Sequence, residues 1–262
     1  MTILIPIDFS DSSIHAAKFA LTHYPDAGFC LLHIVNARQA GSTILVDINE
    51  DLQKFFHERM VKTLAELEML FTDTKIEGKV EVGFFSETLV EEIENSEANL
   101  VVIGTNGASS IDEILLGSNA YLAIKNSSIP LLVIPPNHSL ATPKRILFTS
   151  DFEDDLADKV VQPILDFKNK FNADMHVLHV SHSGAEDDVK MKINHLIDDV
   201  VSRFHVVGEE NVENTIVEYA DEHEFDLIVL APKSRGIIRG LFHQSTTKKV
   251  SAGMKTALFV IK

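Results

Sequence analysis

The sequence predicts an α/β fold of two tandem, open and twisted sheets, each mainly parallel and five-stranded, with helices on both faces. Short apolar runs alternate with segments whose apolar residues recur every three or four positions, as expected for strands joined by helices. The same series of landmarks then occurs twice within the 262 residues. A series repeated in one order indicates two copies of a single folding unit.

The first half alternates strand and helix candidates. Residues 3–7 form the first strand, and residues 11–13, Asp-Ser-Ser, are expected to cap the helix after it. Residues 48–71 are expected to form a long amphipathic helix, because their apolar side chains are spaced by three and four. Residues 79–83 alternate as a strand does, and Ser86 is the expected cap of the next helix. The other strand candidates are 29–35, 100–103 and 129–134.

The second half repeats the strand candidates in the same order. We predict domains at 1–136 and 143–262, joined by a proline-bounded linker. The copies differ between their second and third strands, where the shorter run 187–204 stands in place of the helix 48–71. The matched segments are 3–9 with 144–152, 29–35 with 175–180, 98–103 with 225–230, and 129–134 with 256–261.

Composition argues against several classes of partner. The formal net charge of −16 is unsuited to a nucleic-acid backbone, which is bound by clustered Lys and Arg. Cys30 is the only cysteine and lies in an apolar run, so a core position and a reducing compartment are expected. No apolar stretch approaches the roughly 18 residues of a membrane span, and no basic leader precedes the first strand. We expect a cytoplasmic protein with neither a membrane nor a nucleic-acid partner.

A glycine-rich loop follows the strand candidate 100–103. Gly104 and Gly107 precede a nine-residue spacer, and Gly117 and Ser118 then open the next helix. Glycine lets a ligand approach the backbone closely, and the first N–H groups of a helix attract anions. The stretch is therefore a candidate phosphate site.

With this spacing the chain resembles the universal stress protein family, as a tandem of two domains over essentially its whole length. Gly104, Gly107, Gly117 and Ser118 match the family's nucleotide signature in full. The resemblance implies a Rossmann-like fold of the adenine nucleotide alpha hydrolase type, with ATP, and plausibly Mg²⁺ on its phosphates, at the carboxyl ends of the strands. It also implies a nucleotide-dependent stress-response or signalling module that acts on a protein partner of unknown identity.

The family's binding residues carry over onto matching positions of this sequence. Pro6, Ile7 and Asp8 would border the base and ribose, and the main chain of Ile34 would contact adenine. The ribose and phosphates would be held by Gly104, Asn106, Gly107, Gly117, Ser118 and Asn119.

The second copy departs from the signature. Ala231, Ser234 and Gln244 stand where the first copy has its glycines, and only Ser245 keeps its counterpart. We expect one nucleotide site per chain, because the strands persist without these glycines and a ligand best explains their presence in the first copy. By the family's example, the copies are expected to pair through their fifth strands as an intramolecular pseudo-dimer, and a homodimer stays open.

Some residues have simpler interpretations. Asp8 either positions ligand or caps the turn after its strand, and the ligand role is favoured because the residues at 11–13 can cap. His33 and His179 occupy matching positions and are expected to be structural. Strand alternation separates His179 from His176 and His182, which argues against a zinc site.

No motif identifies a catalytic group. The chain lacks a Walker A sequence, a Gly-x-Ser-x-Gly elbow and a His-Glu-x-x-His helix. A binding module is therefore the leading hypothesis. The alternatives are a slow ATPase or autophosphorylating enzyme, and a scaffold for a small molecule other than a nucleotide.

Overall fold

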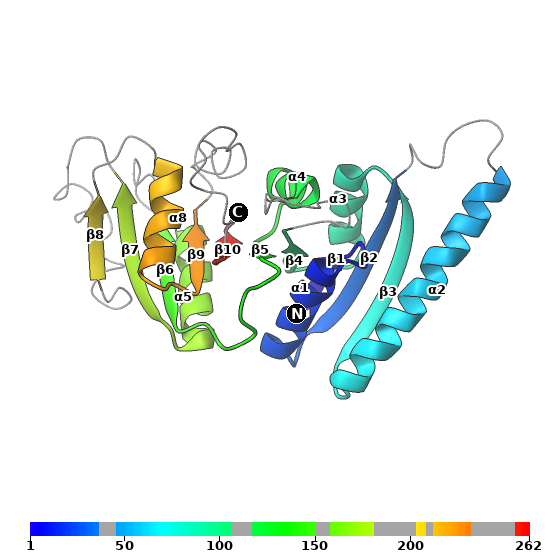
Figure 1. The fold of residues 1–262 in the computed structure, drawn as a ribbon, viewed down its shortest axis with the longest axis horizontal. Coiled ribbons are helices and arrows are strands. Elements are labelled where there is room, and N and C mark those ends of the chain that lie inside the picture. Colours follow the sequence, from blue (N-terminus) through cyan, green and yellow to red (C-terminus); the bar gives the residue numbers. More distant parts are fainter. Residues whose placement is uncertain (37–45, 106–116, 150–157, 181–202, 208–211, 232–254) are drawn as a thin grey trace. The chain divides into compact units, whose positions relative to one another are not determined.

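The computed structural model describes residues 1–36, 46–105, 117–149, 158–180, 203–207, 212–231 and 255–262 (Figure 1). The chain divides into two compact units, Met1–Leu140 and Ala141–Lys262, called unit 1 and unit 2 below. No helix of the described ranges combines the length and the apolar composition that crossing a bilayer requires.

Unit 1 is built on one parallel sheet of order β3-β2-β1-β4-β5 in its described part. The first strand lies in the middle, so the chain moves outward to β3 and then returns across β1 to β4. In chain order the elements are β1 (Thr2–Pro6), α1 (Asp11–His23), β2 (Gly28–Asn36), α2 (Val46–Leu70), β3 (Lys75–Gly83), α3 (Phe85–Asn95), β4 (Leu100–Gly104), α4 (Ser118–Asn126) and β5 (Leu131–Ile134).

Unit 2 repeats this arrangement with the parallel order β8-β7-β6-β9-β10. The two orders correspond strand for strand, so the predicted α/β class with doubled parallel sheets is confirmed. In chain order the elements are β6 (Arg145–Thr149), α5 (Asp158–Phe171), β7 (Asp174–Val180), β8 (Arg203–Val207), α8 (Val212–Glu222), β9 (Leu227–Leu230) and β10 (Ala257–Val260).

The central strands are buried because helices pack on them. In unit 1, α1 contacts β1, β4 and β5, α2 contacts β2 and β3, and α3 contacts β1, β2 and β3. Strands buried on both faces are apolar without alternation, as in β1, where Ile3, Leu4 and Ile5 are fully buried. Each such side chain contributes about 2 kcal/mol on leaving water.

Helix caps and boundaries differ from the predictions. Ser10, not the residues at 11–13, caps α1: its backbone is extended and its hydroxyl accepts the Ser13 N–H at 3.2 Å. The prediction that Ser86 caps the next helix was also wrong. Helix α3 begins at Phe85, its N-cap residue is Phe84, and no side chain forms a capping hydrogen bond. Strand β3 starts at Lys75, four residues earlier than predicted. The prediction missed this start because the exposed charged residues there obscure the apolar–polar alternation of a strand. In unit 2, part of the predicted run 187–204 is strand β8, and 187–202 lie outside the described residues.

A partly buried ion pair joins β3 to α3 in unit 1. Lys79 Nζ lies 2.6 Å from Glu92 Oε2, and the Asn95 amide donates to Glu92 Oε1 at 2.9 Å. Burial opposes the charge on Glu92, but the hydrogen bonds from Lys79 and Asn95 outweigh it and leave the pKa of this carboxyl below its ordinary value. The same hydrogen bond raises the pKa of Lys79. The pair is therefore ionised at neutral pH and fixes α3 on the sheet.

Unit 2 places a different pair at the equivalent position. Cys30 in β2 corresponds to His176 in β7. Cys30 pairs with Glu77, and His176 pairs with Arg203. Two residues further along these strands, His205 therefore corresponds to Lys79. Tyr219 is the eighth residue of α8, as Glu92 is of α3. The rings of His205 and Tyr219 lie 5.4 Å apart. The copies thus share a backbone arrangement and differ in the side-chain pair beneath this helix, an ion pair in unit 1 and a contact between two rings in unit 2.

Cys30, in β2, is expected to be unreactive in the folded protein. Its side chain is buried, and burial raises the pKa of the thiol to about 11, so almost no thiolate forms at pH 8. A disulfide reagent such as Ellman's should react slowly in buffer and at once in concentrated urea. Because the chain has one cysteine, the absorbance change reports this thiol alone. Stoichiometric reaction within seconds in buffer would contradict the buried position.

Candidate functional site

The carboxyl ends of the unit 1 strands bring most of the predicted binding residues to one edge. The strands β1, β2 and β4 are parallel, so their carboxyl ends lie at the same edge of the sheet (Figure 1). Pro6 and Gly104 are the last residues of β1 and β4, and Ile34 lies near the end of β2. Helix α4 begins beside them, because the Gly117 N–H donates to the Thr105 carbonyl directly after β4. The predicted residues Asn106 and Gly107 lie outside the described residues.

Asp8 organises the turn between β1 and α1. One carboxylate oxygen, Oδ1, accepts the Ser10 N–H at 3.0 Å and also the Ser10 hydroxyl. The Asp8 N–H lies 3.4 Å from Ser13 Oγ. Oδ1 of Asp8 therefore stabilises the turn, which is the role that the sequence left as an alternative. These hydrogen bonds hold the Asp8 side chain at the end of the strand.

The end of β1 is further fixed by β2. The Ile7 N–H donates to the Leu32 carbonyl at 2.8 Å, and the His33 Nδ1–H donates to the Ile7 carbonyl at 2.8 Å. His33 is buried, and burial keeps its pKa below the ordinary value, so the ring is neutral at neutral pH. With the proton on Nδ1, Nε2 is an acceptor.

The main chain of Ile34 extends past the end of β1. Main-chain groups alternate sides along a strand, and the Leu32 carbonyl faces β1, so the groups of Ile34 face the same side. The register pairs Pro6 with Leu32, and β1 ends at Pro6. The Ile34 main chain therefore lies at the open end of the β1–β2 ladder, where a flat polar ring can meet it.

Gly104 has an architectural reason that the sequence argument overlooked. A Cβ at this position would lie 2.8 Å from both the carbonyl oxygen and the Oγ of Ser12, in the first turn of α1. Close approach of α1 to the end of β4 thus requires glycine here. Packing against Ser12 is thus a second explanation of Gly104, beside the ligand that the sequence argument proposed. Its equivalent, Ala231, is buried at the end of β9.

The first turn of α4 is prepared for an anion. Gly117 is the N-cap, without a side-chain hydrogen bond, and the turn contains no acid. Ser118 and Asn119 follow it and are exposed. Helix α1 has its own serine cap and α3 has Glu87 in its first turn, so of these three helices α4 alone leaves its first N–H groups uncapped and unopposed.

Thr105 is a polar residue of this edge that sequence analysis missed. It is 3% exposed, and its hydroxyl has no hydrogen-bond partner among the residues that the structure describes. Buried hydroxyls are ordinarily paired, and an unpaired one at a helix N-terminus suits a ligand oxygen. Its place inside the glycine motif, between Gly104 and Gly107, was the available signal. These features fit a bound phosphate.

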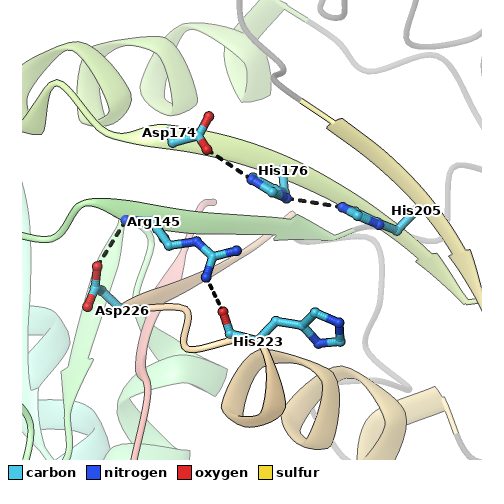
Figure 2. A network of polar contacts seen from close by, with 6 residues as sticks. All are labelled: Arg145, Asp174, His176, His205, His223 and Asp226. Carbon is cyan, nitrogen blue, oxygen red and sulfur yellow. Dashed lines mark hydrogen bonds and ion pairs between the residues drawn. The ribbon is translucent and has the colours of Figure 1, made fainter.

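Unit 2 carries a second polar cluster at the opposite end of its sheet. In Figure 2, His176 Nε2 lies 3.0 Å from Asp174 Oδ2, and His176 Nδ1 lies 3.0 Å from His205 Nε2. The two imidazole rings are stacked, with an interplanar angle of 5°. Arg145 bonds the His223 carbonyl beside them. Asp174 begins β7, so the cluster belongs to the amino half of the sheet and joins β7 to β8.

The cluster is not arranged as a metal site. Both nitrogens of His176 are taken by Asp174 and His205. Across the described ranges, no group of three or more His, Cys, Asp or Glu side chains is placed to hold an ion. His182, Ser234, Gln244 and Ser245 lie outside those ranges, so the degenerate motif of the second copy stays a prediction.

Comparison with models of protein families identifies the family of this chain. The model of the universal stress protein family matches residues 1–135 and 184–262, more than half of the sequence. The chain belongs to the universal stress protein family. Universal stress protein MJ0531 of Methanocaldococcus jannaschii is 30% identical over 136 residues, which are 50% of this chain and 80% of that protein. It therefore corresponds in length to a single copy.

Solved universal stress proteins include one of tandem size. A universal stress protein from Archaeoglobus fulgidus aligns with 100% of this chain and 96% of its own, with a TM-score of 0.74 and 20% identity. That likeness supports the fold of the whole chain. A universal stress protein solved in complex with cAMP aligns with 51% of this chain and 96% of its own, at 25% identity and a TM-score of 0.39.

Proposed function

We propose that unit 1 binds an adenine nucleotide, with ATP as the expected ligand, and that the bound and free forms differ in affinity for a protein partner. The observation that carries the proposal is the uncapped first turn of α4 beside the buried Thr105 hydroxyl, which has no hydrogen-bond partner in the described part of the chain. Both are donors at the edge where parallel α/β sheets receive ligands.

The residues divide into two groups along this edge. Pro6, Ile7, Asp8 and the main chain of Ile34 are proposed to take the base and ribose. The N–H groups of Ser118 and Asn119, with the Ser118 hydroxyl, are proposed to take phosphate beside Gly117, whose own N–H donates to the Thr105 carbonyl. Asn106 and Gly107 are proposed to contribute to the same phosphate site. The contribution of Gly104 is to let α1 approach, which keeps this edge compact.

Charge favours nucleotide bound with a divalent cation. The chain has a formal net charge of −16, which opposes a tri- or tetra-anionic ligand. Mg²⁺ on the phosphates reduces that ligand charge, and phosphate oxygens and water are its usual ligands. We therefore propose that the cation arrives with the nucleotide.

The remaining parts of the proposal concern the whole chain. We propose domains at 1–136 and 143–262, one nucleotide site per chain in the first of them, and a second domain that binds nucleotide weakly or not at all. A cytoplasmic location completes the proposal, since ATP and Mg²⁺ are abundant there.

Ser118→Asp is expected to weaken ATP binding at least tenfold, about 1.4 kcal/mol, while leaving the fold intact. A carboxylate at the start of a helix suits the helix dipole, so α4 is not weakened, but it repels phosphate. Isothermal titration calorimetry of the full chain with Mg·ATP measures the change. The matched control, Ser128→Asp, places the same charge just beyond the other end of α4 and should bind as the parent chain does.

Two outcomes oppose the proposal. Absence of heat with the parent chain at millimolar ATP would overturn nucleotide binding. Equal affinity of Ser118→Asp and Ser128→Asp would overturn the assignment of phosphate to α4. Release of ADP, followed in the same samples, tests the slow ATPase alternative.

A further inference from the structure

We infer that Phe56 and Arg59 of α2 position the base-binding end of β1, so that nucleotide binding and the packing of α2 are coupled. The inference rests on the proposed nucleotide site at the same edge. The residues involved are Phe9, His33, Phe56 and Arg59, called the α2 clamp below.

The first step is the backbone of Phe9. This residue follows Asp8 and has a φ of 61°, in the left-handed region that a bulky side chain rarely adopts. Such a conformation costs roughly 1 to 2 kcal/mol and persists only where surrounding contacts impose it. Phe9 is 9% exposed, so those contacts lie in the protein interior. The conformation of Phe9 sets the direction in which the chain leaves Asp8.

The second step is what holds Phe9 in place. The Phe56 ring lies nearly parallel to the Phe9 ring, at 6° and 6.0 Å between centroids. The Arg59 guanidinium lies 4.9 Å from the centre of the same ring, and its Nη2 donates to the Phe9 carbonyl at 3.4 Å. Both residues come from neighbouring positions on one face of α2. Helix α2 therefore contacts both the side chain and the backbone of Phe9.

The third step connects α2 to Ile7 through His33. The His33 ring lies 4.2 Å from the Phe56 ring and 4.7 Å from the Phe9 ring, between centroids. Its Nδ1–H donates to the Ile7 carbonyl at 2.8 Å. Its other nitrogen, Nε2, is buried without a partner in the described residues. A ring with only one hydrogen bond is held in place mainly by packing, and Phe56 supplies that packing.

Charge locates the clamp at the ribose side of the proposed site. The pKa of His33 is lowered mainly by burial; the Asp8 carboxylate acts on it in one direction and the Arg59 guanidinium in the other. The Arg59 Nη2 also lies 3.4 Å from the carbonyl oxygen of Phe9, the residue that follows Asp8. Asp8 is proposed to face the ribose, so α2 places a cation near that residue.

Coupling follows from linkage. A nucleotide that needs Ile7 and Asp8 in this conformation binds more tightly when α2 already imposes it, and α2 is stabilised by the same free energy when the nucleotide is bound. Helix α2 depends on few interior contacts, because most of its described side chains are exposed while Met60 and Leu67 are buried. Its packing is therefore open to change by a bound ligand.

The test compares clamp variants of the full chain in calorimetric titrations with Mg·ATP. Phe56→Ala and Arg59→Ala are each expected to bind ATP about tenfold more weakly. Phe56→Tyr keeps the ring and should restore affinity. The matched controls are Val61→Ala, which shortens an apolar side chain that is 66% exposed, and Lys62→Ala, which removes an exposed cation. Both controls should bind as the parent chain does.

Hydrogen–deuterium exchange separates positioning from general loss of stability. ATP should slow amide exchange in α2 of the parent chain, and this effect should be absent in Phe56→Ala even where the variant is folded. Two results would overturn the inference if the parent chain binds ATP. One is unchanged ATP affinity in both alanine variants, and the other is amide exchange in α2 that does not change on adding ATP. Neither result would contradict the proposed nucleotide site. If the parent chain binds no ATP, the proposed function fails and the inference fails with it.

Discussion

Replacing Lys79 by methionine is expected to lower the free energy of unfolding by about 3 kcal/mol. Methionine keeps the length of the side chain, but it leaves the Glu92 carboxylate, 8% exposed, with Asn95 as its one remaining side-chain donor among the described residues. Lys79 is itself 35% exposed, which sets the expected loss at the lower end of the range for buried pairs. Urea titration followed by circular dichroism, with the parent chain beside the variant, measures the change.

The controls separate burial from charge. Lys75→Met removes an ion pair of similar length, 3.0 Å to Glu77, whose side chains are 80% and 61% exposed, and should change stability by less than about 0.5 kcal/mol. The double variant Lys79→Met, Glu92→Leu should recover most of the loss, because no buried charge is left alone. A loss in Lys75→Met as large as in Lys79→Met would contradict the structural placement of the buried pair.

The same ion pair predicts the pH range of its effect. Because the pKa of Glu92 is lowered on folding, its contribution is complete above the ordinary value of 4.5 and is lost as the pH falls through the lowered value. Because the pKa of Lys79 is raised, its contribution is lost only as the pH rises beyond 10.5. The destabilisation by Lys79→Met should therefore be constant between these limits.

Replacing Gly104 by alanine is expected to destabilise the protein by about 2 kcal/mol. The new Cβ would meet the Ser12 backbone at 2.8 Å, and backbone cannot rotate away as a flexible side chain can. Either α1 or the end of β4 must move. Thermal unfolding of the parent and variant chains measures the cost without any ligand.

Gly28→Ala is the matched control for this substitution. No atom lies within 4 Å of the Cβ it would add, so the variant should be as stable as the parent chain, or slightly more so. If Gly104→Ala unfolded like Gly28→Ala but failed to bind ATP, the glycine would serve the ligand, as the sequence argument held. A loss of stability without nucleotide instead supports the packing reason.

Much of the fold could be predicted because its signals are local and repeated. The apolar runs of β1, β4 and β5 report burial from both sides, and the second set of runs repeats the first. Caps were less predictable. Ser10, Asp11, Ser12 and Ser13 are all competent capping types, and only backbone geometry decides that Ser10 holds the position.

The candidate site was predictable where its residues share a motif. Gly117 and Ser118 were predicted from their position after strand 100–103 and from the family signature, and the structure brings them to the edge that also holds Asp8. The α2 clamp was not predictable, because Arg59 contacts Phe9 across 50 positions of sequence and no local pattern joins them. Gly104 shows the converse: its motif suggested a ligand, whereas its neighbour Ser12 gives a packing reason that only coordinates reveal.

The side-chain pairs beneath α3 and α8 differ: Lys79 and Glu92 in unit 1, His205 and Tyr219 in unit 2. This difference opposes incorrect pairing of helices and sheets in a tandem protein. Two copies with one backbone risk docking a helix of one on the sheet of the other during folding. Helix α3 on the second sheet would bury Glu92 against His205 without its lysine, and α8 on the first would set Tyr219 against Lys79 and leave that cation unpaired. Each pair therefore disfavours the wrong helix, which opposes the exchange of helices between the duplicated halves.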